Sequence, residues 1–146
     1  MSAETLFNIS MIIAGIGWLV LLILSRFWKF SDKFVIGIIV VLVSMVYCYV
    51  NFGHFAEVKE KWVFLSLEGV MKVFSHPFLV VAGWTHIMAF DLMVGIWIKN
   101  NAAKYGVHYA IVVPILLVTI MLAPFGLLLY HIARWIKTKQ YFGSLQ

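Results

Sequence analysis

Two residues that can exchange protons, His86 and Asp91, lie inside the apolar run from Pro77 to Ile98. The run has 22 residues, which is long enough to cross the hydrocarbon core of a membrane as a helix. An ionisable side chain in that environment costs about 2.5–3.5 kcal/mol on insertion scales, so it requires a partner or a functional reason. At 100° per residue the two side chains are about 140° apart on the helix. They flank one ligand only if it lies across the helix or if other helices complete the site.

Both residues also have a structural explanation. His86 fits a packed histidine that donates to a backbone carbonyl, and Asp91 fits a hydrogen bond that joins two helices inside the membrane. Trp84 shares a helical stripe with Asp91, and a tryptophan in that position is more typical of helix packing than of a cofactor site. The other apolar segments therefore have to be searched for partners.

The composition indicates an integral, multi-pass membrane protein. Of the 146 residues 64% are hydrophobic and 12% are charged, and the mean hydropathy is +1.00. A soluble domain of this length cannot bury that much apolar surface. The net charge of +5 comes from Lys and Arg beside the apolar runs, where they contact lipid headgroups, so nucleic acid is not an expected partner. The single cysteine, Cys48, excludes an internal disulfide.

We predict an all-α fold, an integral membrane four-helix bundle in which residues 1–146 form a single transmembrane domain. The expected spans are the four long apolar runs, at about 6–25, 34–50, 77–98 and 109–132. Pro124 lies inside the fourth run, and its missing N–H predicts a kink near Gly126. Asp32 precedes the second run and is expected to cap the N-terminus of that helix.

The segment at about 57–75 is less apolar than the four runs and is not expected to cross. Its apolar residues recur at helical spacing, while Glu68 and Lys72 form an i,i+4 pair on the other side. This pattern predicts an amphipathic helix in the membrane interface between the second and third spans, or a cap over the bundle. The apolar residues concerned are Val63, Leu67, Val70, Met71 and Phe74.

Four crossings would bring the start of the first and third helices and the end of the second and fourth helices to one side of the membrane. Tyr47, Asn51 and His54 share one face of the second helix, and His86 and His131 are expected at a similar depth. Such a polar half-bundle is typical of a site for an amphiphile, although hydrogen bonds between helices explain the polar face equally well. Basic residues number six on this side and five on the other, so orientation stays undecided.

Metal and cofactor sites are not indicated. No two histidines are three or four residues apart, so the paired-histidine helix motifs of zinc and iron sites are absent. No glycine-rich phosphate loop and no serine-nucleophile elbow is present either. Haem held by His54, His86 or His131 from different helices is the minor alternative that a bundle still allows.

Five segments carry a family resemblance. They are His76-Pro77, the run AGWTHIMAFDLMVGIW from Ala82 to Trp97, the upstream SLEGV from Ser66 to Val70, and the pair Pro114-x-Leu116-x-x-Thr119 and Pro124-x-Gly126-Leu127-Leu128-Leu129-Tyr130. These segments resemble the abscisic-acid-deficient-four family, whose plant members are associated with neoxanthin synthesis. The resemblance covers most of the chain and is more specific for the family than for a substrate.

The resemblance implies a four-helix membrane protein that isomerises a xanthophyll epoxide, or is needed for that step. An epoxide opens, a proton leaves the polyene, and an allene and a hydroxyl form, which needs an acid and a base but no redox cofactor. Under this hypothesis Asp91, kept neutral by desolvation, is the acid and His86 is the base or an orienting group, and the roles are interchangeable. The resemblance implies ring-oxygen contacts from Tyr47, Asn51 and His54, polyene contacts from Trp84, Phe90 and Trp97, and further substrate contacts from Thr119 and His131.

The competing hypothesis is a binding or scaffold protein that holds a lipid or pigment without catalysis. Because no plastid transit sequence is recognisable, a related carotenoid, a retinoid or another lipid stays open as the ligand. The expected partners are the lipid bilayer and one hydrophobic small molecule, and a second copy of the chain is left open. Whether the protein is an enzyme, and in which membrane it resides, does not follow from the residues.

Overall fold

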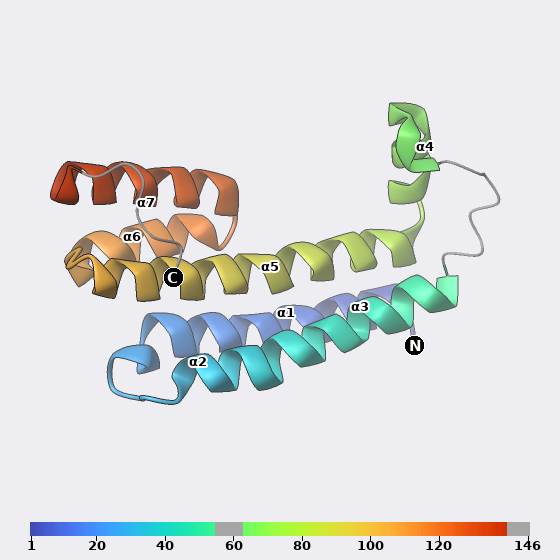
Figure 1. The fold of residues 1–146 in the computed structure, drawn as a ribbon. Helices are drawn as coiled ribbons and strands as arrows, with labels where there is room; N and C mark the ends of the chain where they lie inside the picture. The colour runs from blue at the N-terminus through green and yellow to red at the C-terminus, as the bar shows by residue number, and fades with distance from the viewer. Residues whose placement is uncertain (55–62, 140–146) are drawn as a thin grey trace.

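The structure, a computed structural model, describes residues 1–54 and 63–139, and within these ranges it contains helices joined by turns and no strands (Figure 1). Three helices are long and apolar enough to cross a membrane: α1 (Ala3–Leu22), the continuous helix Ser31–His54, and α5 (Pro77–Lys104). They lie side by side along the length of the molecule. The predicted all-α class is therefore confirmed. The predicted spans 6–25, 34–50 and 77–98 correspond to these helices, with ends that differ by up to six residues.

The second long helix consists of three parts. It begins as α2 (Ser31–Phe34), passes through the π-helical segment η2 (Val35–Val40), and continues as α3 (Val41–His54). The prediction that Asp32 caps this helix is wrong, because its side chain makes no capping hydrogen bond. The Asp32 carboxylate instead forms an ion pair with Lys99 of α5, a partner 67 residues away.

Helix α5 packs closely against α1 because small residues line the contact. A Cβ atom added to Gly95 of α5 would lie 2.8 Å from atoms of both Trp18 and Leu21 of α1. Gly17 of α1 adds a less close contact, since a Cβ there would lie 3.2 Å from Leu92 of α5. Close approach of this kind is how membrane helices gain packing energy without a hydrophobic driving force. The resulting contact fixes the rotation of α5 about its axis.

The predicted fourth span, 109–132, is wrong as a single helix. It is divided into α6 (Tyr109–Thr119) and α7 (Ala123–Thr138), which pack on each other as a hairpin (Figure 1). Pro124 occupies the first turn of α7, where its missing N–H costs nothing, so it starts a helix instead of kinking one. Gly126 allows the sharp reversal, because a Cβ there would lie 2.1 Å from the Thr119 hydroxyl oxygen.

The hairpin returns the chain to the end of the molecule from which α6 departs. Helix α6 has 11 residues, about 16 Å of helix, which is too short to cross a hydrocarbon core of about 30 Å. The C-terminal part of α7 lies beside the C-terminal part of α5, where the Arg134 guanidinium is 5.2 Å from the centre of the Tyr105 ring. The expectation that His131 lies near His54 is therefore wrong. Three long helices and a short hairpin replace the four-helix bundle.

The segment before α5 contains the short helices η4 (Val63–Leu65) and α4 (Leu67–Phe74). Residues 57–62 of the predicted interfacial segment 57–75 lie outside the described residues. The Ser66 hydroxyl caps α4 by accepting from the Gly69 N–H at 3.1 Å, and the predicted Glu68–Lys72 pair is confirmed at 3.3 Å. In Figure 1 α4 stands across the N-terminal end of α5.

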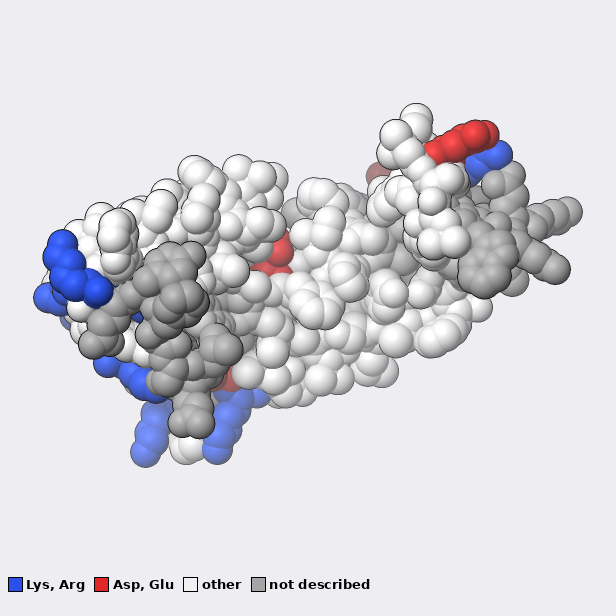
Figure 2. Space-filling model, turned by 45° about the horizontal axis from the view of Figure 1, so that its top comes forward, with Lys and Arg blue, Asp and Glu red and all other residues white. Residues whose placement is uncertain are grey.

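Basic residues gather at the end of the molecule where α1 and α5 terminate (Figure 2). This basic end holds eight of the nine Lys and Arg residues that the structure describes, because the reversal at the α6–α7 turn brings the last three of them to it. The eight are Arg26, Lys29, Lys33, Lys99, Lys104, Arg134, Lys137 and Lys139. The balance of six against five expected from four crossings is therefore wrong.

Candidate functional site

One face of α5 carries four residues that recur at steps of four, three and four: His86, Phe90, Met93 and Trp97. We call it the His86–Trp97 face. His86, Phe90 and Met93 are exposed, and Trp97 is partly exposed. The four residues extend over 11 positions, or about 16 Å at the helical rise. The face is therefore long, mostly apolar and accessible from outside the protein.

Polar groups of α3 border the His86 end of this face. The Tyr47 ring lies 5.8 Å from the His86 imidazole, which in turn lies 4.7 Å from the Phe90 ring. The Asn51 side-chain amide donates to the Tyr47 hydroxyl oxygen at 3.2 Å. Because that oxygen accepts from Asn51, the Tyr47 O–H remains available to donate to another group. The structure thus brings together Tyr47, Asn51, His86 and Phe90, four of the residues that the sequence singles out.

The opposite end of the face is a groove between α5 and α7. It has a volume of about 320 Å³ and is lined by Met93, Val94, Trp97, Leu127 and His131. The Trp97 ring lies 5.7 Å from the His131 ring and meets the Tyr130 ring edge-on at 5.6 Å. Trp97 and His131, both expected to contact a ligand, thus share one groove. Its lining is apolar except for the His131 imidazole.

A buried network of hydrogen bonds lies next to this groove and contacts His131, one of the residues that line it. The Asn101 side-chain oxygen accepts from the Tyr130 hydroxyl at 2.6 Å and from the Arg134 guanidinium at 3.1 Å. A second guanidinium nitrogen lies 3.4 Å from Nδ1 of His131. Asn101, Tyr130 and Arg134 are all buried, so the network holds the His131 ring in place. Sequence analysis missed it, although Tyr130 and Arg134 are four residues apart on one helix, the one available signal.

Asp91 and His86 are both without polar partners within residues 1–54 and 63–139. Asp91 is 7% exposed, yet its carboxyl group forms no hydrogen bond or ion pair with a described residue, and the same holds for the His86 imidazole. The structural hydrogen bonds that would explain these residues are therefore not formed in the described part of the chain. Asp91 shares its side of α5 with Gly95, which packs on α1, whereas His86 faces Tyr47. The structure does not bring the two groups together.

Three further residues that the sequence singles out lie apart from the His86–Trp97 face. The Trp84 indole N–H donates to the sulfur of Met11 at 3.3 Å, so this ring packs on α1. Thr119 is fully buried at the end of α6, where its hydroxyl donates to the Ile115 carbonyl at 2.7 Å. His54 stacks on the Phe78 ring at 3.7 Å, near the first turn of α5.

The histidines are poorly placed for a shared metal or haem iron. His54 stacks on Phe78 of α5, and His131 lies against Trp97 of α5. His86 belongs to α5 itself and lies against Phe90. The three histidines are therefore spread along that helix. Two axial ligands of one iron must face each other across it, which this spread does not allow. Within the described ranges no three His, Cys, Asp or Glu side chains form a group that could hold a metal ion.

The chain matches a known protein family over most of its length. The family model ABA4-like, described as ABA DEFICIENT 4-like, matches residues 5–130. The chain belongs to the ABA4-like family. The match includes both ends of the His86–Trp97 face and ends at Tyr130, so the site described above lies almost wholly inside the part that defines this ABA4-like protein. No curated protein and no solved structure matches the chain significantly.

Proposed function

We propose that this ABA4-like protein is a multi-pass membrane protein that binds an elongated, carotenoid-like molecule along the His86–Trp97 face and isomerises it by proton transfer. The observation that carries the proposal is the unpartnered His86 imidazole on an otherwise apolar, outward face of a long α5 helix. An imidazole turned to lipid without a partner is costly. A ligand with a polar end group would remove that cost.

The shape of the face supports an elongated ligand. Phe90, Met93 and Trp97 supply about 10 Å of apolar and aromatic contact, which suits a flat polyene better than a compact molecule. Polar groups stand at both ends, Tyr47 with His86 at one and His131 at the other. Family membership favours a xanthophyll, since such a molecule has an apolar chain between oxygenated rings.

The chemistry that we propose is an epoxide isomerisation without a cofactor. His86 accepts the proton that leaves the polyene, and the Tyr47 hydroxyl, oriented by Asn51, donates to the epoxide oxygen as the ring opens. The bond between carbon and the epoxide oxygen breaks, a new carbon–carbon double bond forms, and the departing proton balances the one that the oxygen gains. No electrons leave the substrate, so no redox partner is required.

Asp91 is the second catalytic candidate, and it requires a different approach of the substrate. Its carboxyl group lies about 140° around α5 from His86, so one end group cannot contact both. Asp91 could act as the acid only for a molecule that enters on the side of α5 that faces α1. Trp84 belongs to that side, because it packs on Met11. Paired variants of His86 and Asp91 therefore decide which side of α5 holds the substrate.

Blocking the groove at the Trp97 end is expected to release the bound molecule. Leu127→Phe fills a groove of about 320 Å³, so the amount of apolar molecule that copurifies with the protein is expected to fall about tenfold. The measurement is organic extraction of the purified protein followed by chromatography and absorption spectra. Leu128→Phe is the control, because Leu128 points outward and is 55% exposed. Equal retention by both variants would contradict binding in this groove.

We also propose an orientation in the membrane. The basic end carries eight of the nine described Lys and Arg residues, and basic loops stay on the cytoplasmic side. The N-terminus then lies on the opposite side. Exposed apolar side chains such as Ile12, Leu19 and Met45 would contact lipid, and α4, whose Leu67 and Met71 are exposed, would lie in the far interface. Helices α6 and α7 would enter the membrane from the basic end and return to it.

Cysteine labelling of intact bacterial cells that express the chain tests this orientation. In a Cys48→Ser background, Glu4→Cys is expected to react with a membrane-impermeant maleimide, whereas Lys29→Cys and Lys137→Cys react only after lysis. Labelling of Lys29→Cys in intact cells would reverse the orientation. Labelling of Lys137→Cys but not of Lys29→Cys would show that residues 109–132 cross the membrane and would overturn the hairpin.

A further inference from the structure

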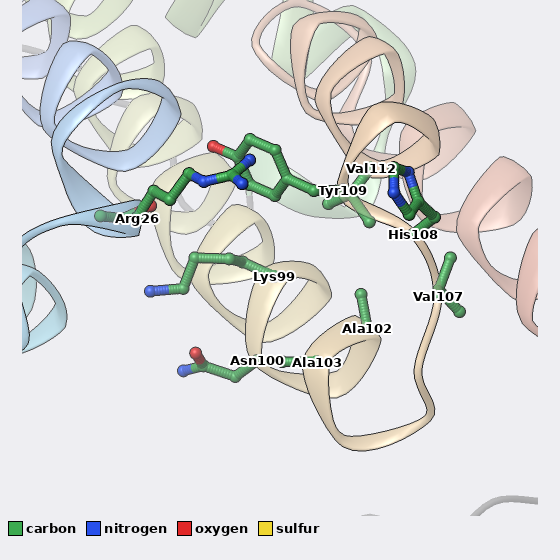
Figure 3. Close-up of a pocket in the computed structure, with 10 residues that line it drawn as sticks. Arg26, Lys99, Asn100, Ala102, Ala103, Val107, His108, Tyr109 and Val112 are labelled. Carbon is green, nitrogen blue, oxygen red and sulfur yellow. The ribbon is translucent and has the colours of Figure 1, made fainter.

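A second pocket lies at the basic end, away from the His86–Trp97 face. Its volume is about 430 Å³, and it opens between η1 (Leu24–Arg26), the last turns of α5 and the start of α6 (Figure 3). Its polar lining comes from Ser25, Arg26, Lys99, Asn100, His108 and Tyr109, and no acidic residue among those that the structure describes lines it. The pocket therefore combines two cations with an apolar floor formed by Ala102, Val107 and Val112.

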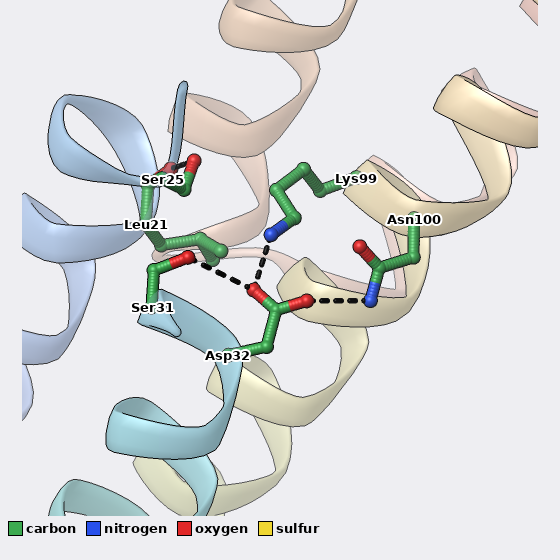
Figure 4. Close-up of polar contacts among 6 residues, drawn as sticks. All are labelled: Leu21, Ser25, Ser31, Asp32, Lys99 and Asn100. Atoms are coloured by element: carbon green, nitrogen blue, oxygen red, sulfur yellow. Dashed lines mark hydrogen bonds and ion pairs between the residues drawn. The ribbon is translucent and has the colours of Figure 1, made fainter. Parts of the chain in front are cut away.

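The two cations of this pocket, Lys99 and Arg26, contact different neighbouring residues. Lys99 forms an ion pair with Asp32, and the Asn100 amide donates to the same carboxylate at 2.8 Å (Figure 4). The Arg26 guanidinium lies over the Tyr109 ring, 5.6 Å from its centre, and the Tyr109 hydroxyl donates to the Leu22 carbonyl at 2.7 Å. Asp32 thus neutralises the charge of Lys99. The N–H groups around the edge of the Arg26 guanidinium donate to no described residue and are available to bind an anion.

His108 adds a neutral donor to the same pocket. Its Nδ1 accepts from the Ala110 N–H at 3.2 Å, so in the neutral ring the proton is carried by Nε2. Arg26 and His108 stand on either side of Tyr109 in Figure 3. Two donors of this kind, one charged, on the rim of a pocket with apolar lining fit a phosphate group that has acyl chains attached.

We propose that this pocket, the Arg26–His108 pocket, binds the phosphate of an anionic phospholipid from the leaflet at the basic end. The inference rests on the membrane-spanning arrangement proposed above, because only that arrangement puts the pocket at headgroup depth. Arg26 contacts the phosphate oxygens, His108 donates to one of them, and the acyl chains lie along Val112. The lipid would tie η1 to the start of α6.

Lipid retention by the purified full-length chain tests this proposal. The protein is exchanged into detergent with equal amounts of phosphatidylglycerol and phosphatidylcholine, washed, and its retained lipid is quantified by mass spectrometry. Phosphatidylglycerol is expected to be enriched about tenfold, because phosphatidylcholine carries next to its phosphate a choline cation that Arg26 repels, and Arg26→Gln is expected to abolish the enrichment. Lys29→Gln removes an exposed charge at the same end but outside the pocket, so it should keep the enrichment.

Three results would overturn the proposal. If wild type retains both lipids equally, the pocket does not select an anionic headgroup. If Arg26→Gln and Lys29→Gln lose the enrichment alike, the lipid is attracted by the basic end as a whole. If excess inorganic phosphate displaces the phosphatidylglycerol, the ligand is a free phosphate and not a lipid. The cysteine labelling described above is done first, so a chain that does not span the membrane is detected separately.

Discussion

Replacing His86 with glutamine is expected to remove the product of the proposed isomerisation. Loss of a positioned general base lowers the rate by about 100-fold or more, and glutamine keeps polarity and approximate size without accepting a proton. The measurement is pigment chromatography of violaxanthin-accumulating cells that express the chain, where wild type is expected to form neoxanthin. Asp91→Asn is expected to keep product within about tenfold of wild type, because Asp91 lies on the other side of α5.

A matched control separates this effect from the cost of a polar group in the membrane. Ile87→Gln introduces the same side chain one residue further along α5, where Ile87 is exposed and belongs to neither candidate site. It is expected to keep full product. Loss of product in Asp91→Asn with retention in His86→Gln would move the reaction to the side of α5 that faces α1. Bound but unchanged pigment in wild type would favour the non-catalytic alternative.

Replacing Asn101 with leucine is expected to destabilise the protein by about 3 kcal/mol. Asn101 is 7% exposed and its side-chain oxygen accepts from both Tyr130 and Arg134, so leucine removes the acceptor that these two buried groups share. The loss is measured as a shift in the midpoint of unfolding in a detergent titration. Asn101→Asp keeps an acceptor beside Arg134 and should unfold much closer to wild type.

The neighbouring residue provides the control for this experiment. Asn100 is exposed, and its amide contacts Asp32 at the protein surface, so Asn100→Leu is expected to cost less than about 1 kcal/mol. If Asn100→Leu and Asn101→Leu destabilise equally, the polar network does not support the α5–α7 contact. The same variants also test the groove, because His131 contacts Arg134.

The long helices could be predicted from the sequence because apolar length and flanking charge are local signals. The α6–α7 hairpin could not be predicted, because Pro124 is compatible with two opposite local structures. Inside a continuous helix it predicts a kink, but with Gly126 packed on Thr119 it becomes the start of a new helix. One reversal then moves Arg134 and the charges after it to the opposite end. Local periodicity contains no information about that choice.

Only part of the candidate functional site could be predicted from the sequence, for a similar reason. Tyr47, Asn51 and His54 share a face of one helix, which spacing reveals, and contact with His86 then follows from two antiparallel neighbours. The Asn101 network joins residues 29 and 33 positions apart, across the reversal that the sequence did not predict. The sequence likewise predicts Asp32 as a cap, because its partner on α5 is distant in the sequence. Polar pairs between residues that are far apart in the chain produce no periodic pattern in the sequence.

The π-helical turns η2 lie between two points at which the second long helix is attached to α5. Before them Asp32 is paired with Lys99, and after them Tyr47 lies against His86. A π turn accommodates about one residue more than an α turn, and one residue corresponds to about 100° of rotation. A chain shortened by one residue within 35–40 would close these turns into an ordinary α-helix and keep both attachments, whereas the same deletion within 41–46 would turn the Tyr47 hydroxyl away from the imidazole. The π-helical turns thus take up one surplus residue, so that both attachments to α5 form at once.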